Sequence, residues 1–168
     1  VSDYEQDPRV AVDLGVETAS GFLDASDLIA AFSDGIDDDQ NGFVDDIAGW
    51  DFFEDDNNPW ASLLDGVAAD HGTGVMKDAV APADDGGSIG VCPNCSLLPI
   101  RVGDGFITDG DRVARALEYV AQNDVDVAAM AIGALSHSAR TRAAVELADA
   151  NGVVMVGAAG DENAYHHN

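Results

Sequence analysis

The alternation of apolar runs with helical patterns in the C-terminal half most strongly constrains the fold of this 168-residue chain. The elements expected there are, in order, a strand over 97–102, a helix from Asp109 or Asp111 to Asn123, a strand over 125–132, a helix over 137–150 and a strand over 153–159. Strands that are apolar on both faces and linked by helices form parallel sheets that are covered on both sides. The pattern therefore predicts an α/β fold with a doubly wound parallel sheet and helices on both faces.

An acidic residue lies near the end of another apolar run, 10–16, which reads as a short buried strand. Ligand-facing residues of parallel sheets lie at the carboxyl ends of strands. A buried carboxylate must be paired, because burying it alone is costly. Asp13 is therefore a candidate orienting partner for a histidine, and a surface aspartate on an edge strand is the alternative. Residues 24–32 read as partly helical, and 49–53 as a further strand.

A histidine flanked by small residues occurs in Asp70-His71-Gly72-Thr73-Gly74-Val75, just before a short helical run that stops at Pro82. The start of a helix carries partial positive charge, which disfavours imidazolium and keeps the ring able to accept a proton near pH 7. A general base needs this property. Taken alone, the segment equally fits a turn histidine that is satisfied by a local hydrogen bond.

The charge of the chain is strongly negative, with 32 acidic and 7 basic residues and a formal net charge of −25. Such a field repels nucleic acids and anionic membranes and attracts cations, so we expect no nucleic-acid partner. No stretch has the apolar length of a membrane span, and no charged-then-apolar leader opens the chain. The chain does not begin with Met, and we expect a processed or trimmed product, which leaves room for a secretion signal upstream.

One acidic segment, 35–46, has the spacing of a calcium loop. Acidic and amide side chains alternate there, a glycine allows a sharp turn, and a backbone carbonyl follows it, as oxygen-ligand loops require. Ala48 stands where an EF-hand has its bidentate Glu, so this is not a standard EF-hand. A solvated, disordered acidic loop is the alternative. The expected ligands are Asp37, Asp39, Asn41, the Phe43 carbonyl, and Asp45 or Asp46.

Two cysteines, Cys92 and Cys95, are the only ones in the chain. Their spacing fits a disulfide across a turn, a redox pair, or half of a zinc site. A thioredoxin-type pair opens a helix, whereas a strand-like run follows here, and the only clustered candidates for further zinc ligands are His166 and His167. We therefore favour a local disulfide.

Together these motifs resemble the subtilisin-like serine proteases, the subtilase or peptidase S8 family. Asp13 in Val-Asp-Leu-Gly-Val resembles the aspartate motif of that family and the His71 segment its histidine motif, in the order that subtilisins have. Residues 35–52 resemble the acidic calcium-type insert of secreted bacterial members, and 90–102 resemble the Gly-Val-Ala-Pro-Asn-Ala segment with cysteines in place of both alanines. The resemblance spans nearly the whole chain.

The resemblance also assigns the substrate cleft. Residues 130–134 resemble the Met-Ser-Leu-Gly-Gly strand along which the substrate backbone pairs, and 158–161 resemble the Ala-Ala-Gly-Asn segment at the oxyanion hole. The implied substrate-binding residues are Ala131, Ile132, Gly133, Ala134, Ala158, Ala159 and Gly160, and Asp161 takes the oxyanion-hole position.

The sequence departs from the family pattern at four places. Gly74 replaces a second histidine that is not catalytic, and Ala131 and Ala134 replace a serine and a glycine of the cleft. Asp161 stands where the oxyanion asparagine is expected. The sequence stops at Asn168, before the Gly-Thr-Ser segment of the nucleophile.

The resemblance implies that residues 1–168 are the N-terminal part of one subtilisin-like peptidase domain of a secreted, Ca²⁺-binding serine endopeptidase. Asp13 orients His71, His71 is the general base, and a serine in the C-terminal remainder of the same gene product attacks a peptide or protein substrate. Asp161 and the missing nucleophile motivate an alternative: a catalytically inactive homologue that acts as a calcium-stabilised binding or assembly module.

Overall fold

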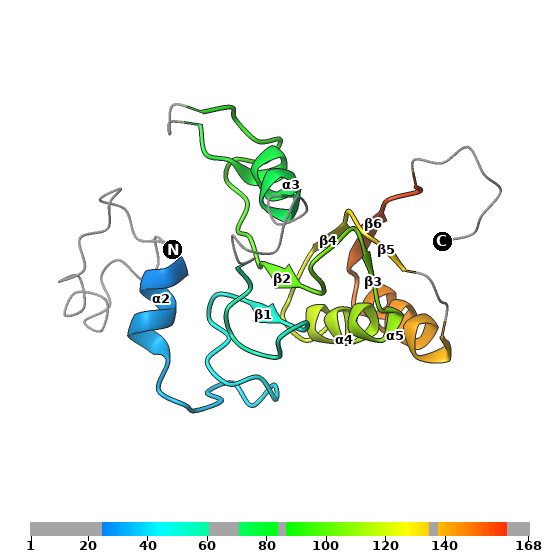
Figure 1. Cartoon of the computed structure of the whole chain (residues 1–168), viewed down its shortest axis with the longest axis horizontal. Coiled ribbons are helices and arrows are strands. Elements are labelled where there is room, and N and C mark those ends of the chain that lie inside the picture. Colours follow the sequence, from blue (N-terminus) through cyan, green and yellow to red (C-terminus); the bar gives the residue numbers. More distant parts are fainter. Residues whose placement is uncertain (1–24, 61–70, 84–86, 135–137, 161–168) are drawn as a thin grey trace. The chain divides into compact units, whose positions relative to one another are not determined.

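The computed structural model describes residues 25–60, 71–83, 87–134 and 138–160. The chain divides into two compact units: residues 1–60 with 98–100, and residues 61–97 with 101–168. Each unit is described by itself below (Figure 1). No helix among the described residues is long and apolar enough to cross a membrane.

The first unit contains the helix α2 (Ala25–Phe32), the acidic segment and the strand β1 (Trp50–Asp51). Its apolar centre is aromatic: the ring of Phe43 packs edge-on against Trp50 at 5.0 Å and Phe52 at 5.5 Å between centroids. The strand expected over 49–53 is shorter because the buried Asp51 carboxylate accepts hydrogen bonds from the Phe53 and Glu54 amides. These two bonds turn the chain out of the strand.

The strand β2 (Ile100–Arg101) pairs with β1, and residues 98–100 belong to this first unit. It is shorter than the expected 97–102 because Pro99 has no backbone N–H to donate to a neighbouring strand. Pro99 packs instead on Gly49, whose φ of +103° favours glycine and whose missing Cβ leaves room for the Pro99 carbonyl.

The second unit begins its described part with the helix α3 (His71–Val80) and contains two parallel strand pairs. In one pair, β3 (Ile107–Thr108) lies beside β5 (Gly133–Ala134), with Ile107 opposite Gly133. In the other, β4 (Val127–Met130) lies beside β6 (Val154–Gly157), with Val127 opposite Val154. The helix α5 (Ala139–Ala150) connects β4 and β5 to β6, as parallel pairing requires.

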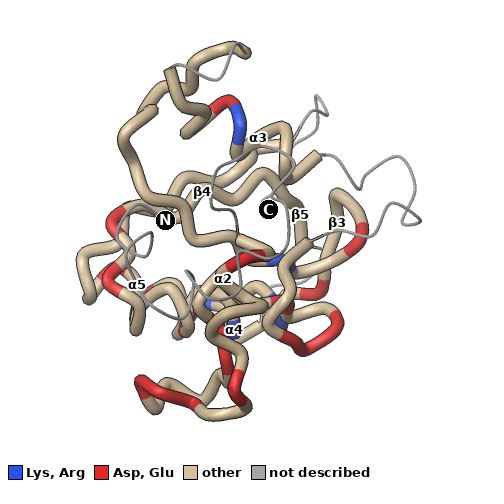
Figure 2. The backbone as a smooth tube through the Cα atoms, turned by 90° about the vertical axis from the view of Figure 1, so that its left-hand side faces the viewer, with Lys and Arg blue, Asp and Glu red and all other residues tan. Residues whose placement is uncertain are grey.

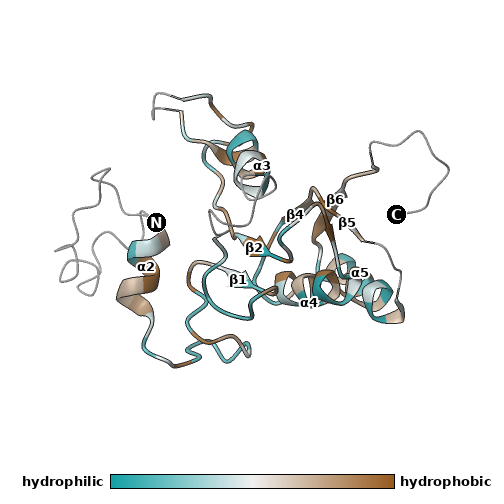
Figure 3. Ribbon diagram, viewed as in Figure 1, coloured by the Kyte–Doolittle hydropathy of each residue, from teal (hydrophilic) through white to brown (hydrophobic). Residues whose placement is uncertain are grey.

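The helices α4 (Gly110–Val120) and α5 pack against each other and supply much of the buried core of this unit. The buried residues of α4 include Leu117 and Tyr119, and α5 buries only Ala144 and Ala148, whose small side chains allow close approach. Figure 3 shows hydrophilic and hydrophobic residues alternating along α4. This pattern is the amphipathic one that predicted the helix.

The ends of both helices follow from side-chain caps. The Asp109 carboxylate accepts from the Asp111 amide at the start of α4, and Ser138 Oγ accepts from the Thr141 amide at the start of α5. The helix α4 ends at Val120, three residues earlier than expected, because Asn123 Nδ2 turns back to donate to the Tyr119 carbonyl. The helix α5 ends where Asn151 caps it, as the sequence predicts.

The α/β class is therefore confirmed, whereas the doubly wound order stays a prediction. The described strands form three sheets of two strands each, all short. The strand expected over 10–16 lies outside the described residues, and β4 and β6 are shorter than the apolar runs 125–132 and 153–159 that predicted them.

Candidate functional site

His71 is the first residue of α3, as the sequence predicts. The side chain is half-buried, and its ring meets the ring of Phe106 edge-on, with 4.8 Å between centroids and 86° between planes. Gly72 and Gly74, in the first turn of the helix, have open space where a Cβ would stand. The start of α3 thus offers a histidine that is held by one aromatic contact and has uncrowded backbone beside it.

Phe106 connects this histidine with the strand on which we expect substrate to bind. The Phe106 carbonyl accepts a hydrogen bond of 2.8 Å from the Gly133 amide, and the next two residues form β3 beside β5. Phe106 was not singled out from the sequence. The only signal is a large apolar residue in an otherwise polar, glycine-containing turn, and its side chain is 52% exposed.

The expected oxyanion segment follows β6 directly. The Ala158 amide donates to the Met130 carbonyl over 3.0 Å, so this segment begins beside the end of β4. Ala131 and Ile132 lie between β4 and β5 and are half-buried, whereas Ala158, Ala159 and Gly160 are exposed. The second unit therefore holds His71, residues 131–134 and residues 158–160, and all three segments lie at strand ends or at the start of a helix.

The expected partners of His71 in the chemistry lie outside the described residues. These are Asp13, the predicted orienting carboxylate, and Asp161, at the predicted oxyanion position. Their assignment to the site stays a prediction.

The acidic segment of the first unit is organised around Asn41. The Asn41 amide N–H donates to Asp37 Oδ1 at 3.2 Å and Asp39 Oδ1 at 3.1 Å, and Asn41 Nδ2 donates to Asp39 Oδ2 at 3.0 Å and Asp46 Oδ2 at 2.9 Å. Three of the predicted carboxylate ligands thus lie within hydrogen-bonding distance of the Asn41 side chain or its backbone amide. Figure 2 shows acidic residues recurring in loops of the chain, with few basic ones.

Asp45 and Phe43 make different contacts in the same segment. The Asp45 carboxylate accepts from the Asp34 amide at 2.9 Å and the Gly35 amide at 3.0 Å, which closes the loop. The Phe43 ring lies in the aromatic cluster, while its amide donates to Asn41 Oδ1 at 2.8 Å. Of the two acids that the sequence left open as the closing ligand, Asp46 is the one bonded to Asn41.

The electrostatics of the segment suit a cation. Desolvation raises the pKa of the Asp39 carboxyl. A hydrogen bond from the backbone N–H of Asn41 opposes that shift, and the nearby carboxylates of Asp46 and Asp37 raise the pKa further. Carboxylate, amide and carbonyl oxygens are the ligands that Ca²⁺ takes. Across the part of the chain that the structure describes, no three His, Cys, Asp or Glu side chains are gathered as a metal site.

The two cysteines are joined in the structure, with their Cα atoms 5.4 Å apart, which is an ordinary spacing for a disulfide. The Cys95 amide also donates to the Cys92 carbonyl at 3.0 Å, so the four residues form a closed turn. His166 and His167, the candidate zinc ligands, lie outside the described residues.

Comparison with known proteins identifies the family of the chain. The model of the subtilase family matches residues 24–168. The major intracellular serine protease of Bacillus subtilis is 33% identical over 118 residues, which are 69% of this chain and 36% of that protein. Subtilisin DY of Bacillus licheniformis is 37% identical over 54% of this chain and 34% of its own length. Alkaline elastase YaB of a Bacillus species is 35% identical over 56% of this chain and 25% of its own length.

The matched part thus spans about a third or less of each of these relatives. The family model, by contrast, covers most of the present sequence, including His71, the strand 130–134 and the segment after β6. On these grounds the chain belongs to the subtilase family.

Proposed function

We propose that this chain is the triad-bearing N-terminal part of a secreted, calcium-binding serine endopeptidase. The observation that carries the proposal is the position of His71 at the start of α3, in ring contact with Phe106, whose carbonyl is bonded to Gly133 on the expected substrate strand. A general base belongs within reach of a bound substrate. The three relatives reported above are named a serine protease, a subtilisin and an elastase, which supports the same reaction class.

In the proposed mechanism, Asp13 accepts a hydrogen bond from the His71 ring and fixes its tautomer. His71 takes the proton of a serine hydroxyl as the serine attacks the peptide carbonyl, and then gives that proton to the leaving amine. We propose that the serine lies in a segment beyond residue 168 of the same gene product. The substrate backbone pairs with residues 131–134, and the segment 158–161 lies at the developing oxyanion.

Calcium is the proposed resident ion of the first unit. Asp37, Asp39 and Asp46 would supply carboxylates, Asn41 its amide oxygen and Phe43 its carbonyl, with Asp45 supporting the loop. In the structure the three carboxylates are hydrogen-bonded to Asn41 and are not gathered around one point, so binding of the ion would have to draw them together. The ion would supply positive charge that offsets the repulsion among these acids, and it would take no part in the proton transfers. We further propose that the described strands belong to one doubly wound sheet.

Secretion is proposed from the cysteine pair, because disulfides persist in oxidising compartments. The relative that aligns over 69% of the chain is named an intracellular protease, so the compartment needs its own measurement. Culture supernatant and cell lysate of the native organism are probed with an antibody against this chain. We expect the protein in the supernatant with Cys92 and Cys95 resistant to alkylation before reduction. Protein confined to the lysate, with both thiols alkylated, contradicts secretion.

A fluorophosphonate probe tests the enzymatic proposal on the full-length gene product, since labelling requires an activated serine. We expect one labelled serine, outside residues 1–168, and loss of labelling after heat denaturation. An unlabelled, folded protein favours the alternative of an inactive, calcium-stabilised binding module, for which an aspartate at position 161 is the motivating observation.

A further inference from the structure

The Cys92–Cys95 turn caps the helix that begins at His71. The last carbonyls of a helix have no partners within it. At the end of α3, the Asp78 carbonyl accepts from the Val91 amide at 3.1 Å and the Ala79 carbonyl from the Cys92 amide at 2.8 Å. Just beyond the helix, the Ala81 carbonyl accepts from the Gly90 amide at 2.9 Å. Three consecutive amides of the turn segment, residues 90–92, therefore donate hydrogen bonds to carbonyls at or just beyond the C-terminal end of α3.

The packing at this cap is tight. Gly90 is buried, and a Cβ built on it would overlap the backbone around Val80 and Ala81. The segment 90–92 thus lies directly against the helix end. The turn that follows is closed twice, by the bond between the Cys92 and Cys95 sulfurs and by the Cys95 amide on the Cys92 carbonyl.

Packing against the described part of the chain gives α3 limited support. None of its ten residues is buried, and it contains two glycines, Gly72 and Gly74, which are poor helix formers. Short helices are marginal in water without tertiary packing or caps. A cap that is itself fixed by a covalent bond is therefore a main support of the element that carries the proposed general base.

Both cysteines are exposed to solvent. An exposed disulfide is accessible to a thiol, and the chain holds no other cysteine that could react in its place. We propose that Cys92–Cys95 is a thiol-sensitive brace: reduction by a dithiol loosens the cap of α3 and so misplaces His71. The positioning role of the pair rests on the proposed protease function, whereas its effect on α3 does not.

The reaction is a two-electron thiol–disulfide exchange. One thiolate of the dithiol attacks a sulfur of the Cys92–Cys95 bond, which breaks as a mixed disulfide forms. The second thiol of the reagent then displaces the protein sulfur. The reagent becomes a disulfide and two electrons pass to the protein. Cys92 and Cys95 each become a thiol with one added hydrogen. A small-molecule dithiol or a dithiol oxidoreductase is the class of partner that supplies these electrons.

Hydrogen exchange tests the structural half on the full-length gene product, whether or not that product is active. Peptides from α3 and from α5 are compared before and after reduction with dithiothreitol. We expect exchange in α3 to accelerate about tenfold while α5 stays unchanged, and protection to return on reoxidation. Equal exchange in α3 in both states overturns the proposal. The variant Cys92→Ala/Cys95→Ala serves as the matched control: it should show fast α3 exchange in either condition, and slow exchange in this variant also overturns the brace.

Kinetics of the full-length gene product test the positioning half. We expect reduction to lower kcat about tenfold with KM nearly unchanged, within the roughly 100-fold loss that a 1 Å misplacement can cause. The double alanine variant should not respond to reductant. A reductant effect on KM alone, or an equal effect on the variant, contradicts positioning of His71. If reduction accelerates hydrogen exchange in α3 but neither the oxidised nor the reduced form cleaves peptide, the structural role of the disulfide is supported and the protease proposal fails.

Discussion

At the scale of single residues, the most consequential departure from the family pattern is Asp161. An asparagine at this position donates a hydrogen bond to the oxyanion, and losing that donor costs about 2.7–4 kcal/mol in subtilisin. An ionised aspartate accepts hydrogen bonds only and repels the developing negative charge. If Asp161 takes the predicted oxyanion position, the enzyme should therefore be slower at neutral pH than one with asparagine there.

The variant Asp161→Asn tests this interpretation. We expect a higher kcat at neutral pH, measured with the full-length gene product on a fluorogenic peptide. Asp109→Asn, at the start of α4, controls for the loss of one negative charge. An Asp161→Asn enzyme that is no faster than the wild type shows that other donors hold the oxyanion.

Gly49 gives a residue-scale prediction about stability. Both Gly49 and Gly35 have positive φ, at +103° and +82°, but only at Gly49 would an added Cβ overlap a neighbouring atom, the Pro99 carbonyl. Gly35→Ala should therefore lower the free energy of unfolding by about 1 kcal/mol, from backbone strain alone. Gly49→Ala should lower it by about 3 kcal/mol or more, because backbone strain and atomic overlap add. Urea denaturation of both variants measures the difference, and equal losses would show that the Gly49–Pro99 contact does not exist in solution.

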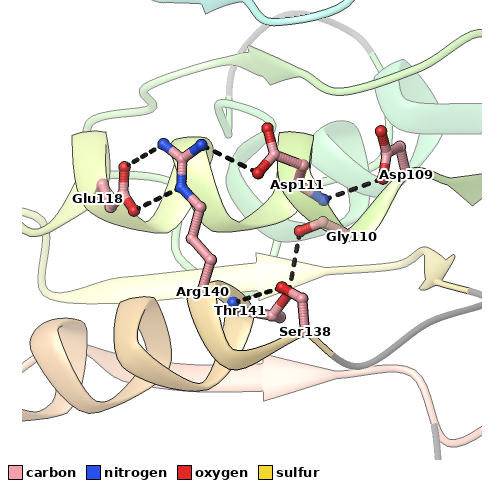
Figure 4. A network of polar contacts seen from close by, with 7 residues as sticks. All are labelled: Asp109, Gly110, Asp111, Glu118, Ser138, Arg140 and Thr141. Carbon is pink, nitrogen blue, oxygen red and sulfur yellow. Dashed lines mark hydrogen bonds and ion pairs between the residues drawn. The ribbon is translucent and has the colours of Figure 1, made fainter.

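At the scale of elements, Arg140 joins α4 and α5. Its guanidinium donates to both oxygens of Glu118, at 3.0 and 2.8 Å, and to Asp111 Oδ1 at 2.9 Å (Figure 4). Beside it, Thr141 Oγ1 donates to the Gly110 carbonyl over 3.2 Å. The hydrogen bond from Arg140 lowers the pKa of the Glu118 carboxyl. This bidentate pairing of Arg140 with Glu118 requires the planar guanidinium, which lysine lacks.

Arg140→Lys should accordingly lower Tm by about 2 °C or less, since the pair is partly exposed and such pairs stabilise little. Arg142→Lys on the same helix is the matched control and should change Tm less. Because the folded pKa of Glu118 is depressed, the stabilisation is present above its unfolded value of 4.5 and is lost as pH falls through the lower folded value. A difference between the two variants that persists well below that pH argues against the ion pair as its source.

Sequence reasoning predicted which segments are helices and strands better than it predicted their lengths. The helix caps at Asp109, Ser138 and Asn151 are local, so the boundaries they set follow from a few neighbouring residues. The short strand β2 instead depends on Pro99 meeting Gly49, 50 positions away in the sequence. A contact of that kind has no local signal. The ring contact of Phe106 with His71 and the cap of α3 by residues 90–92 could not be predicted for the same reason.

At the scale of the whole molecule, the net charge of −25 makes cations the natural stabilisers. A calcium site filled at 100 times its dissociation constant adds about 2.7 kcal/mol, which corresponds to about 5–10 °C in Tm. Removing Ca²⁺ with EDTA should therefore lower Tm by that amount. An unchanged Tm, with no metal detected by native mass spectrometry, contradicts the site.

The contribution of Asp39 to the stability of the fold depends on pH. Its folded pKa is raised, so protonation stabilises the fold below the unfolded value of 3.8, and that gain is lost as pH rises through the folded value. Above it, Ca²⁺ bound at the proposed site would take the place of the proton. Asp39→Asn should raise Tm in EDTA at neutral pH yet abolish the response to Ca²⁺, whereas the exposed neighbour Asp38→Asn should keep that response. A full calcium response in Asp39→Asn removes Asp39 from the ligand set.

A kinetic comparison of three proteins tests whether His71 is the general base of a serine endopeptidase. The full-length gene product is assayed on a fluorogenic peptide as wild type, as His71→Ala, and as Lys77→Ala, an exposed change on the same helix. We expect His71→Ala to lower kcat by about 10⁴-fold or more, the range known for triad residues of subtilisins, while Lys77→Ala stays near wild type. A His71→Ala protein that is folded and keeps wild-type turnover would contradict this role of His71.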